Sequence, residues 1–320
     1  MTQKEILEYG KTISIEDYVN GLQAHPYIPQ SDRCIADLIK KHLADKEKSK
    51  VLDLGCGPAR LTTSIAGENQ NHEFIGIDSS PEFLNNAILH RGNITGNNTF
   101  LVLDHFEDIA MSTGSNIVLN PDNPFQVIFM QGVWHHIHGE TRHTWLEKIK
   151  TLLADDGILI IGDEYIPDYE DEGERKLFLV RFYAHIIGEA IRGGFSVLAE
   201  EEAKNLVDDV TAGGEGAGMM DGLLLSTIFK HSTEINNTMF HNINHMAGLT
   251  KSERLLSIIL EETRLLEKEG SRDSFYRGDF KVSMTENIKE MESFGFSLKE
   301  KFTFGPTNHI GGMGVIVFNK

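Results

Sequence analysis

Residues 51–58 read Val-Leu-Asp-Leu-Gly-Cys-Gly-Pro, which is a short apolar run followed at once by a glycine-rich turn. Residues with helical spacing follow from about Leu61. A strand that runs through a tight turn into a helix is the repeating unit of parallel α/β sheets. The glycines let the backbone approach a ligand closely, and amides at a helix start favour an anionic group. The stretch therefore predicts an α/β fold with a ligand site at the end of one strand.

Four more apolar runs continue this pattern, and each ends on a polar or glycine residue. They cover residues 74–77, 100–103, 127–130 and 158–161. Ser80 and Pro81 predict a helix start after the second run, because serine caps helices and proline suits the first helical turn. Residues 141–153 have helical spacing, and the turn at 155–157 leads into the fifth run. This alternation is typical of a parallel sheet covered by helices.

The C-terminus has a different pattern, with two strands in succession. Residues 283–286 read Ser-Met-Thr-Glu, a capping box that predicts a helix ending near Gly295. The strand-like runs 296–304 and 313–318 follow, joined by a stretch rich in glycine and turn-forming residues. They predict an antiparallel hairpin that closes the sheet.

The spacing of these elements predicts three parts of the chain. Residues 1–50 form an N-terminal helical segment, whose apolar stripe is Ile35, Leu38, Ile39 and Leu43. Residues 51–165 and 281–320 form the α/β core. Residues 166–280 are far too long for an ordinary connection, which has about 2–6 residues, so we expect an inserted helical lid over the substrate. A long amphipathic helix is predicted within it from about Thr250 to Lys268.

Composition narrows the function. The 320 residues include 30 Lys and Arg against 48 Asp and Glu, a net charge of −18, which disfavours a nucleic-acid partner. The sequence has no apolar run of the length that a membrane span needs, so we expect no membrane insertion. Only two cysteines are present, too few for a disulfide framework, and we expect a cytoplasmic location.

The glycine loop itself disfavours a dinucleotide. The dinucleotide fingerprint requires a third glycine where Arg60 stands. Asp53, just before the first glycine, suggests instead the recognition of a cationic amine. A nicotinamide-dependent oxidoreductase is kept as an alternative because it shares the alternating strands and an acid after the second strand.

Residues 51–58 also resemble motif I of class I S-adenosylmethionine-dependent methyltransferases. In that family an acid that ends the second strand holds the ribose hydroxyls, which corresponds to Asp78, and Asp104 matches the residue that recognises adenine. Residues 131–136, Gln-Gly-Val-Trp-His-His, resemble the loop of the small-molecule branch that includes ubiquinone and menaquinone biosynthesis methyltransferases. Two departures are Ala59, in place of the motif's third glycine, and Gln126, where an Asp often begins the fourth strand.

The resemblance implies a Rossmann-like, seven-stranded methyltransferase sheet whose last strands form the antiparallel hairpin. It implies S-adenosyl-L-methionine as cofactor and S-adenosyl-L-homocysteine as product. The expected cofactor-binding residues are Asp53, Gly55, Gly57, Asp78, Ser79, Asp104, His105 and Gln131.

The expected reaction is methyl transfer to a small-molecule acceptor, in which positioning and exclusion of water supply much of the acceleration. His136, helped or replaced by His135, is the expected base, because imidazole titrates near neutrality and both follow the fourth strand. A purely structural role for these histidines is the alternative. Trp134, Glu164 and Tyr165 are expected to contact the acceptor.

Several alternatives stay open. O-methylation is preferred, with N- or C-methylation next. The alternative from a different functional class is a protein that binds the cofactor but has non-methylation chemistry or a regulatory role. His241 and His245 have the i, i+4 spacing that two metal ligands would share on a helix, but without a placed third ligand no metal site is predicted. The expected oligomeric state is a monomer or a homodimer.

Overall fold

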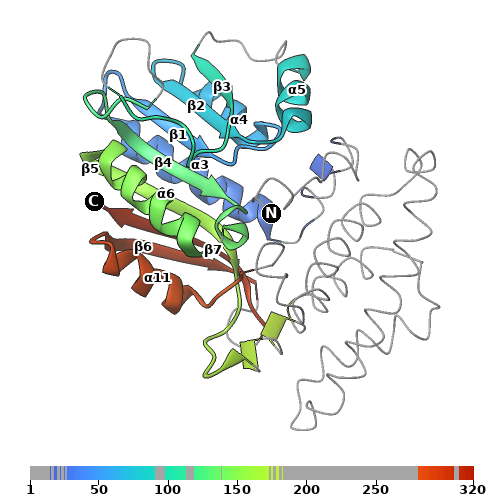
Figure 1. The fold of residues 1–320 in the computed structure, drawn as a ribbon. Helices are drawn as coiled ribbons and strands as arrows, with labels where there is room; N and C mark the ends of the chain where they lie inside the picture. The colour runs from blue at the N-terminus through green and yellow to red at the C-terminus, as the bar shows by residue number, and fades with distance from the viewer. Residues whose placement is uncertain are drawn as a thin grey trace, which may run out of the picture. The chain divides into compact units, whose positions relative to one another are not determined.

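The computed structural model describes residues 27–90, 98–112, 119–137, 139–172, 280–305 and 310–320, with ten single residues between 15 and 182. Its centre is a seven-stranded sheet in the order β3-β2-β1-β4-β5-β7-β6 (Figure 1). The strands are β1 (Lys50–Leu54), β2 (Glu73–Asp78), β3 (Thr99–Leu103), β4 (Phe125–Gln131), β5 (Leu153–Tyr165), β6 (Ser297–Phe304) and β7 (Gly312–Asn319). All five predicted apolar runs and both hairpin strands are therefore confirmed as strands, and so is the predicted Rossmann-like, seven-stranded sheet with its antiparallel hairpin.

The strands β3, β2, β1, β4 and β5 pair in parallel, while β6 and β7 are antiparallel. Parallel pairing brings the carboxyl ends of the first five strands to one edge, where open α/β sheets bind ligands. The register aligns Leu54 with Ile77, Asp78 with Leu103, and Gln131 with Gly162. This edge is called the carboxyl edge below.

Helices cover both faces of the sheet. They are α3 (Ile28–Leu43), α4 (Arg60–Glu68), α5 (Pro81–His90), α6 (Gly139–Leu152) and α11 (Met284–Ser293), with a short 3₁₀ helix η3 (Trp134–His136). In Figure 1, α6 and α11 lie in front of the sheet and α3 lies behind it. The predicted stripe on α3 is buried in one apolar cluster with α4 and with side chains of β1, β2, β4, β5 and β7.

One predicted turn lies inside a strand. Residues 155–157 belong to β5, which begins at Leu153. The register with β4 jumps there, because Phe125 pairs with Leu153 whereas Val127 pairs with Ile158. The extra residues of β5 form an irregularity in its pairing with β4. At this irregularity, a Cβ on Gly157 would come within 3.0 Å of the carbonyl oxygen of Ala154. The local turn signal was real, but sheet pairing continues past it.

The chain forms two compact units. One consists of Gln30–Glu164, Met284–Phe304 and Met313–Lys320, and the other of Met1–Pro29, Tyr165–Ser283 and Gly305–Gly312. Within the second unit Ile166 forms a parallel bridge with Ser283, so the two ends of the predicted insertion meet. Most of the predicted lid lies outside the described residues, including the helix predicted at about 250–268, the glycine-rich run at 213–218, His241 and His245, so these remain predictions. In the part of the chain that is described, no helix is long and apolar enough to cross a membrane.

The packing of α3 predicts the effect of truncating its apolar face. Ile39 is fully buried against the sheet, so Ile39→Ala should lower the free energy of unfolding by about 2–5 kcal/mol. Lys40→Ala is the control, because the Lys40 side chain is exposed and its ion pair with Glu68 lies at the surface; it should change stability by less than about 0.5 kcal/mol. Denaturant unfolding measures both, and equal effects would show that α3 does not anchor the core.

Candidate functional site

The glycine loop connects β1 to α4 through three residues in the left-handed conformation. Gly55, Gly57 and Ala59 have φ angles of 70°, 53° and 55°. The Gly55 N–H donates to the carbonyl oxygen of Ile77 at 2.8 Å, which fixes the loop beside β2. An added Cβ at Gly55 would meet Val133 at 2.6 Å, whereas one at Gly57 would meet no atom of the described residues within 4 Å. The loop is therefore packed at its first glycine and open at its second, where a ligand can approach the backbone.

Asp78 joins the glycine loop to the start of α5. Its Oδ2 accepts the Gly57 N–H at 2.7 Å, and its Oδ1 accepts the Ser80 N–H at 2.8 Å. Burial raises the pKa of Asp78 above its ordinary value, and the two N–H donors oppose that rise. The carboxylate thus lies beside the open glycine, while Ser79, the next predicted cofactor-binding residue, is exposed.

Asp53 lies inside the sheet rather than at its surface. Asp53 is only 3% exposed, and its Oδ2 accepts a hydrogen bond from the Thr62 hydroxyl. Burial raises the pKa of Asp53 to about 7, and the Thr62 hydrogen bond opposes this. An ionised Asp53 would gain from a cationic partner, the kind of group that it is predicted to recognise.

The loop after β3 carries the predicted adenine-side residues. Asp104 is exposed, and its Oδ1 accepts the N–H of His105 at 2.8 Å. Lys148 of α6 donates to the carbonyl oxygens of Phe106 and Ile109, both at 2.9 Å. A cation on α6 therefore fixes the course of this loop from the side.

Gln131, at the end of β4, faces its neighbour β5 and helix α3. Its Oε1 accepts a hydrogen bond from the Ser31 hydroxyl at 3.2 Å. A Cβ on Gly162 would lie 1.9 Å from the same oxygen, so Gly162 leaves the space that the Gln131 side chain occupies. Ser31 was not predicted from the sequence.

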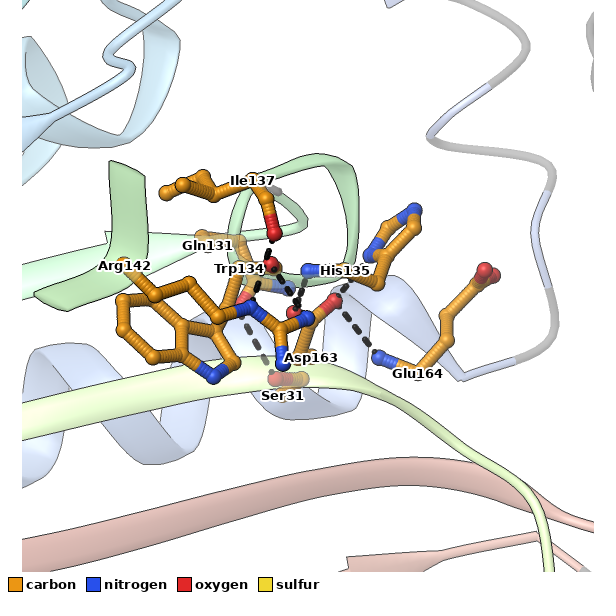
Figure 2. Close-up of polar contacts among 8 residues, drawn as sticks. All are labelled: Ser31, Gln131, Trp134, His135, Ile137, Arg142, Asp163 and Glu164. Carbon is orange, nitrogen blue, oxygen red and sulfur yellow. Dashed lines mark hydrogen bonds and ion pairs between the residues drawn. The ribbon is translucent and has the colours of Figure 1, made fainter. Parts of the chain in front are cut away.

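The clearest polar contact at the carboxyl edge is between His135 and Asp163 (Figure 2). His135 belongs to η3 and is 4% exposed; Asp163 lies near the end of β5 and is 1% exposed. Asp163 Oδ1 pairs with His135 Nδ1, and Oδ2 accepts the His135 backbone N–H at 2.8 Å. Oδ1 also accepts the Glu164 N–H at 2.8 Å. One carboxylate therefore fixes both the ring and the backbone of His135.

His136 contacts the same pair through its neighbour. Its ring centroid lies 3.8 Å from that of His135, with the rings tilted by 48°. His136 is partly exposed, unlike His135. The two predicted bases thus lie together, and Asp163 contacts the ring of His135 directly.

The three residues predicted to contact the acceptor are all buried. Trp134 is in η3, and its indole lies under the Arg142 guanidinium at 5.0 Å. Glu164 is in the unit that contains the sheet, and Figure 2 shows its carboxylate pointing away from Asp163. Tyr165 is the first residue of the Tyr165–Ser283 segment, which belongs to the other unit.

Sequence reasoning did not single out Asp163 as a site residue. It stands in an acidic stretch that continues to Glu174, which reads as a solvated turn. The signal that could have found it is strand register, because Asp163 follows Gly162, the partner of Gln131 at the end of β4. No cluster of three metal-ligating side chains occurs among the residues that the structure describes.

Part of the chain is similar in sequence to known proteins. Residues 52–159 match a family described as a methyltransferase domain. The carboxy-S-adenosyl-L-methionine synthases of Aliivibrio fischeri and Photobacterium profundum are 29% and 28% identical over 137 and 168 residues, covering 42% and 52% of this chain. The matches cover 51% and 62% of those relatives, so the chain spans about half to three fifths of their length.

The similar solved structures include the 1,6-didemethyltoxoflavin-N1-methyltransferase of Burkholderia thailandensis. It is 13% identical, with a TM-score of 0.44, covering 91% of this chain and 78% of that one.

The raised pKa of Asp53 predicts how stability depends on pH. Between pH 3.8 and about 7 the folded protein retains a proton that the unfolded chain has released. Stability must therefore fall as pH rises through this window, by up to about 4 kcal/mol at about 1.4 kcal/mol per pH unit. The penalty is absent below about pH 4 and complete above about pH 7.

Asp53→Asn removes this titration. Relative to the wild type, the variant should gain about 3 kcal/mol of stability between pH 5 and pH 8, measured by denaturant unfolding at each pH. A stability difference that stays constant across that range would contradict the buried, protonated state of Asp53.

Proposed function

We propose that this chain, which carries a class I S-adenosylmethionine-dependent methyltransferase domain and uses that cofactor, transfers the methyl group to a small-molecule acceptor. O-methylation is our first choice, with N- or C-methylation as the other forms of the same transfer. The observation that carries the proposal is the His135–Asp163 pair at the carboxyl edge. The pair lies at the ends of β4 and β5, and β4 is the neighbour of β1, which leads into the glycine loop. A cytoplasmic location and a monomeric or dimeric state stay predictions from the sequence.

The cofactor would lie along the first three strand ends. The open side of Gly57 admits it to the backbone, and Asp78 stands next to that opening. Each Asp78 oxygen already accepts one N–H, and a carboxylate oxygen has two lone pairs, so each can accept a ribose hydroxyl as well. Asp104 and His105 would contact the adenine end, and Asp53 would favour the cofactor's amine.

The donor needs little chemical help, because a sulfonium methyl is already activated for in-line displacement. The protein's share is to align the acceptor with the methyl group, to exclude water and, for a hydroxyl acceptor, to remove a proton. The acceptor oxygen forms a bond to the methyl carbon while the carbon–sulfur bond breaks, and the acceptor proton goes to the base.

His135 is the better oriented of the two expected bases. Asp163 accepts from Nδ1, which leaves Nε2 as the ring nitrogen that can take a proton. The same carboxylate would stabilise the imidazolium that forms. His136, packed against His135 and partly exposed, would help to position the acceptor or replace His135 as base.

One observation favours a second candidate. The two curated relatives reported above are named for making carboxy-S-adenosyl-L-methionine, so the same domain serves a reaction whose product is a modified cofactor. In that case this chain would bind S-adenosylmethionine as a substrate, and no methyl group would reach a separate acceptor. The fate of the labelled methyl group distinguishes the two functions.

Cofactor binding is tested at Asp78. Asp78→Ala removes two charge-assisted hydrogen bonds to the ribose, each worth about 1.5–3 kcal/mol, so the affinity for S-adenosylhomocysteine should fall at least tenfold. Asp122→Ala, at an exposed loop position, is the matched control and should bind normally. Calorimetry gives both constants, and unchanged affinity of Asp78→Ala would remove the ribose assignment.

The base is tested by three single variants. His135→Gln and Asp163→Asn should each lower kcat by about 10²–10⁴-fold if proton transfer limits the rate, while cofactor affinity stays within about threefold. His136→Gln should lower kcat less than His135→Gln does. Wild-type activity should also decline toward acid pH, where imidazole takes up a proton.

The measurement is kcat against pH for each variant, with cofactor affinity from calorimetry. If His135→Gln keeps a near-normal kcat and a flat pH profile, then neither proton removal by His135 nor its orientation by Asp163 contributes. Positioning alone would then account for the transfer, as expected for an acceptor that is already a nucleophilic amine or carbon.

A further inference from the structure

Arg142 is a buried cation that none of the roles above uses. It lies on α6 and is only 6% exposed. Its guanidinium contacts η3 (Figure 2). Burying an arginine is costly unless all its charge and its donors are matched. Its contacts therefore show what this cation holds in place.

The guanidinium binds the backbone on both sides of the two histidines. Nε donates to the carbonyl oxygen of Ile137 at 2.8 Å, and Nη2 donates to that of Trp134 at 3.1 Å. Those carbonyls belong to the first residue of η3 and to the residue just after it. His135 and His136 lie between them, so one planar group holds both ends of the segment that carries the expected bases.

Two further contacts fix the guanidinium itself. Nη1 lies 3.3 Å from Oε2 of Glu290, on α11, and the guanidinium carbon lies 5.0 Å from the centre of the Trp134 ring. An anion and an aromatic face are the two partners that best match a desolvated guanidinium. Arg142 is thereby anchored to α6, to α11 and to η3 at once.

We infer that Arg142 is a positioning residue for the proposed methyl transfer, because it sets the backbone of η3 from one side while Asp163 sets it from the other. Asp163 holds the His135 N–H and ring; Arg142 holds the carbonyls before and after the histidines. The expected effect of Arg142 on the reaction rate rests on the proposed function, whereas its expected effect on the η3 backbone does not.

A lysine cannot replace this arrangement. Its ammonium is a single point with rotatable donors, whereas the arginine fork reaches two carbonyls and one carboxylate in a fixed plane. Arg142→Lys should therefore keep the charge and the contact with Glu290 but lose at least one of the two backbone bonds. This variant separates the positioning geometry from the presence of a positive charge.

The first measurement is hydrogen–deuterium exchange, which requires no substrate. The amides of His136 and Ile137 donate within the turn, to Val133 and Trp134, and report whether it is held. We expect exchange in the peptide covering residues 134–137 to be at least tenfold faster in Arg142→Gln and Arg142→Lys. Lys46→Gln, which breaks the surface pair with Asp156, is the matched control and should leave that peptide unchanged.

The second measurement is kinetic. Both Arg142 variants should lose at least tenfold in kcat, with the affinity for S-adenosylhomocysteine within about threefold of the wild type and a smaller change in KM. The pH dependence of kcat should also shift or flatten, because the orientation of His135 is altered. A change in stability alone would not separate kcat from cofactor affinity in this way.

The outcomes are distinguishable. Unchanged exchange at residues 134–137 in Arg142→Lys would overturn the inference whatever reaction the protein catalyses. Faster exchange with normal kcat would also overturn it, since the backbone would move without effect on the rate. If the wild type transfers no methyl group, the proposed function fails, and the exchange result still decides whether Arg142 holds η3. If Arg142→Gln does not fold, Arg142→Lys gives the decision.

Discussion

Parallel pairing of β1 with β2 and β4 is the constraint on which the site depends. Because parallel strands end at the same edge, residues far apart in the chain meet there without any local signal between them. The pairing brings the glycine loop next to Asp78, and the pairing of β4 with β5 brings His135 next to Asp163. Any change that shifted this register would separate the two halves of the proposed chemistry.

Helix α6 contributes more than a cover for the sheet. Two of its cations donate to backbone carbonyls of the loops that follow β3 and β4, Lys148 to the first and Arg142 to the second. The loops of an α/β sheet hold its functional residues. Such loops lack the repeating backbone hydrogen bonds that fix helices and strands. Here a regular helix supplies the missing donors, which is how flexible segments can present side chains in a defined geometry.

Local patterns predicted the elements well, because apolar runs, capping residues and glycine turns act over a few residues. The strand at 74–77, the helix starting at Pro81 and the C-terminal hairpin are all where the sequence placed them. The exceptions depend on tertiary pairing. The turn at 155–157 is carried inside β5, and Asp163 reaches His135 across 28 residues. A carboxylate within an acidic stretch has no local feature that identifies its distant partner, so the pair became visible only with the register.

The most direct test of the account follows the methyl group itself. The wild-type protein is incubated with S-adenosylmethionine labelled in the methyl carbon and with a metabolite extract, and the products are separated by mass spectrometry. If the protein transfers the methyl group to a small-molecule acceptor, a labelled small molecule forms in equal amount with S-adenosylhomocysteine. Consumption of the cofactor with the label retained on a modified sulfonium, and no labelled acceptor, would contradict the account.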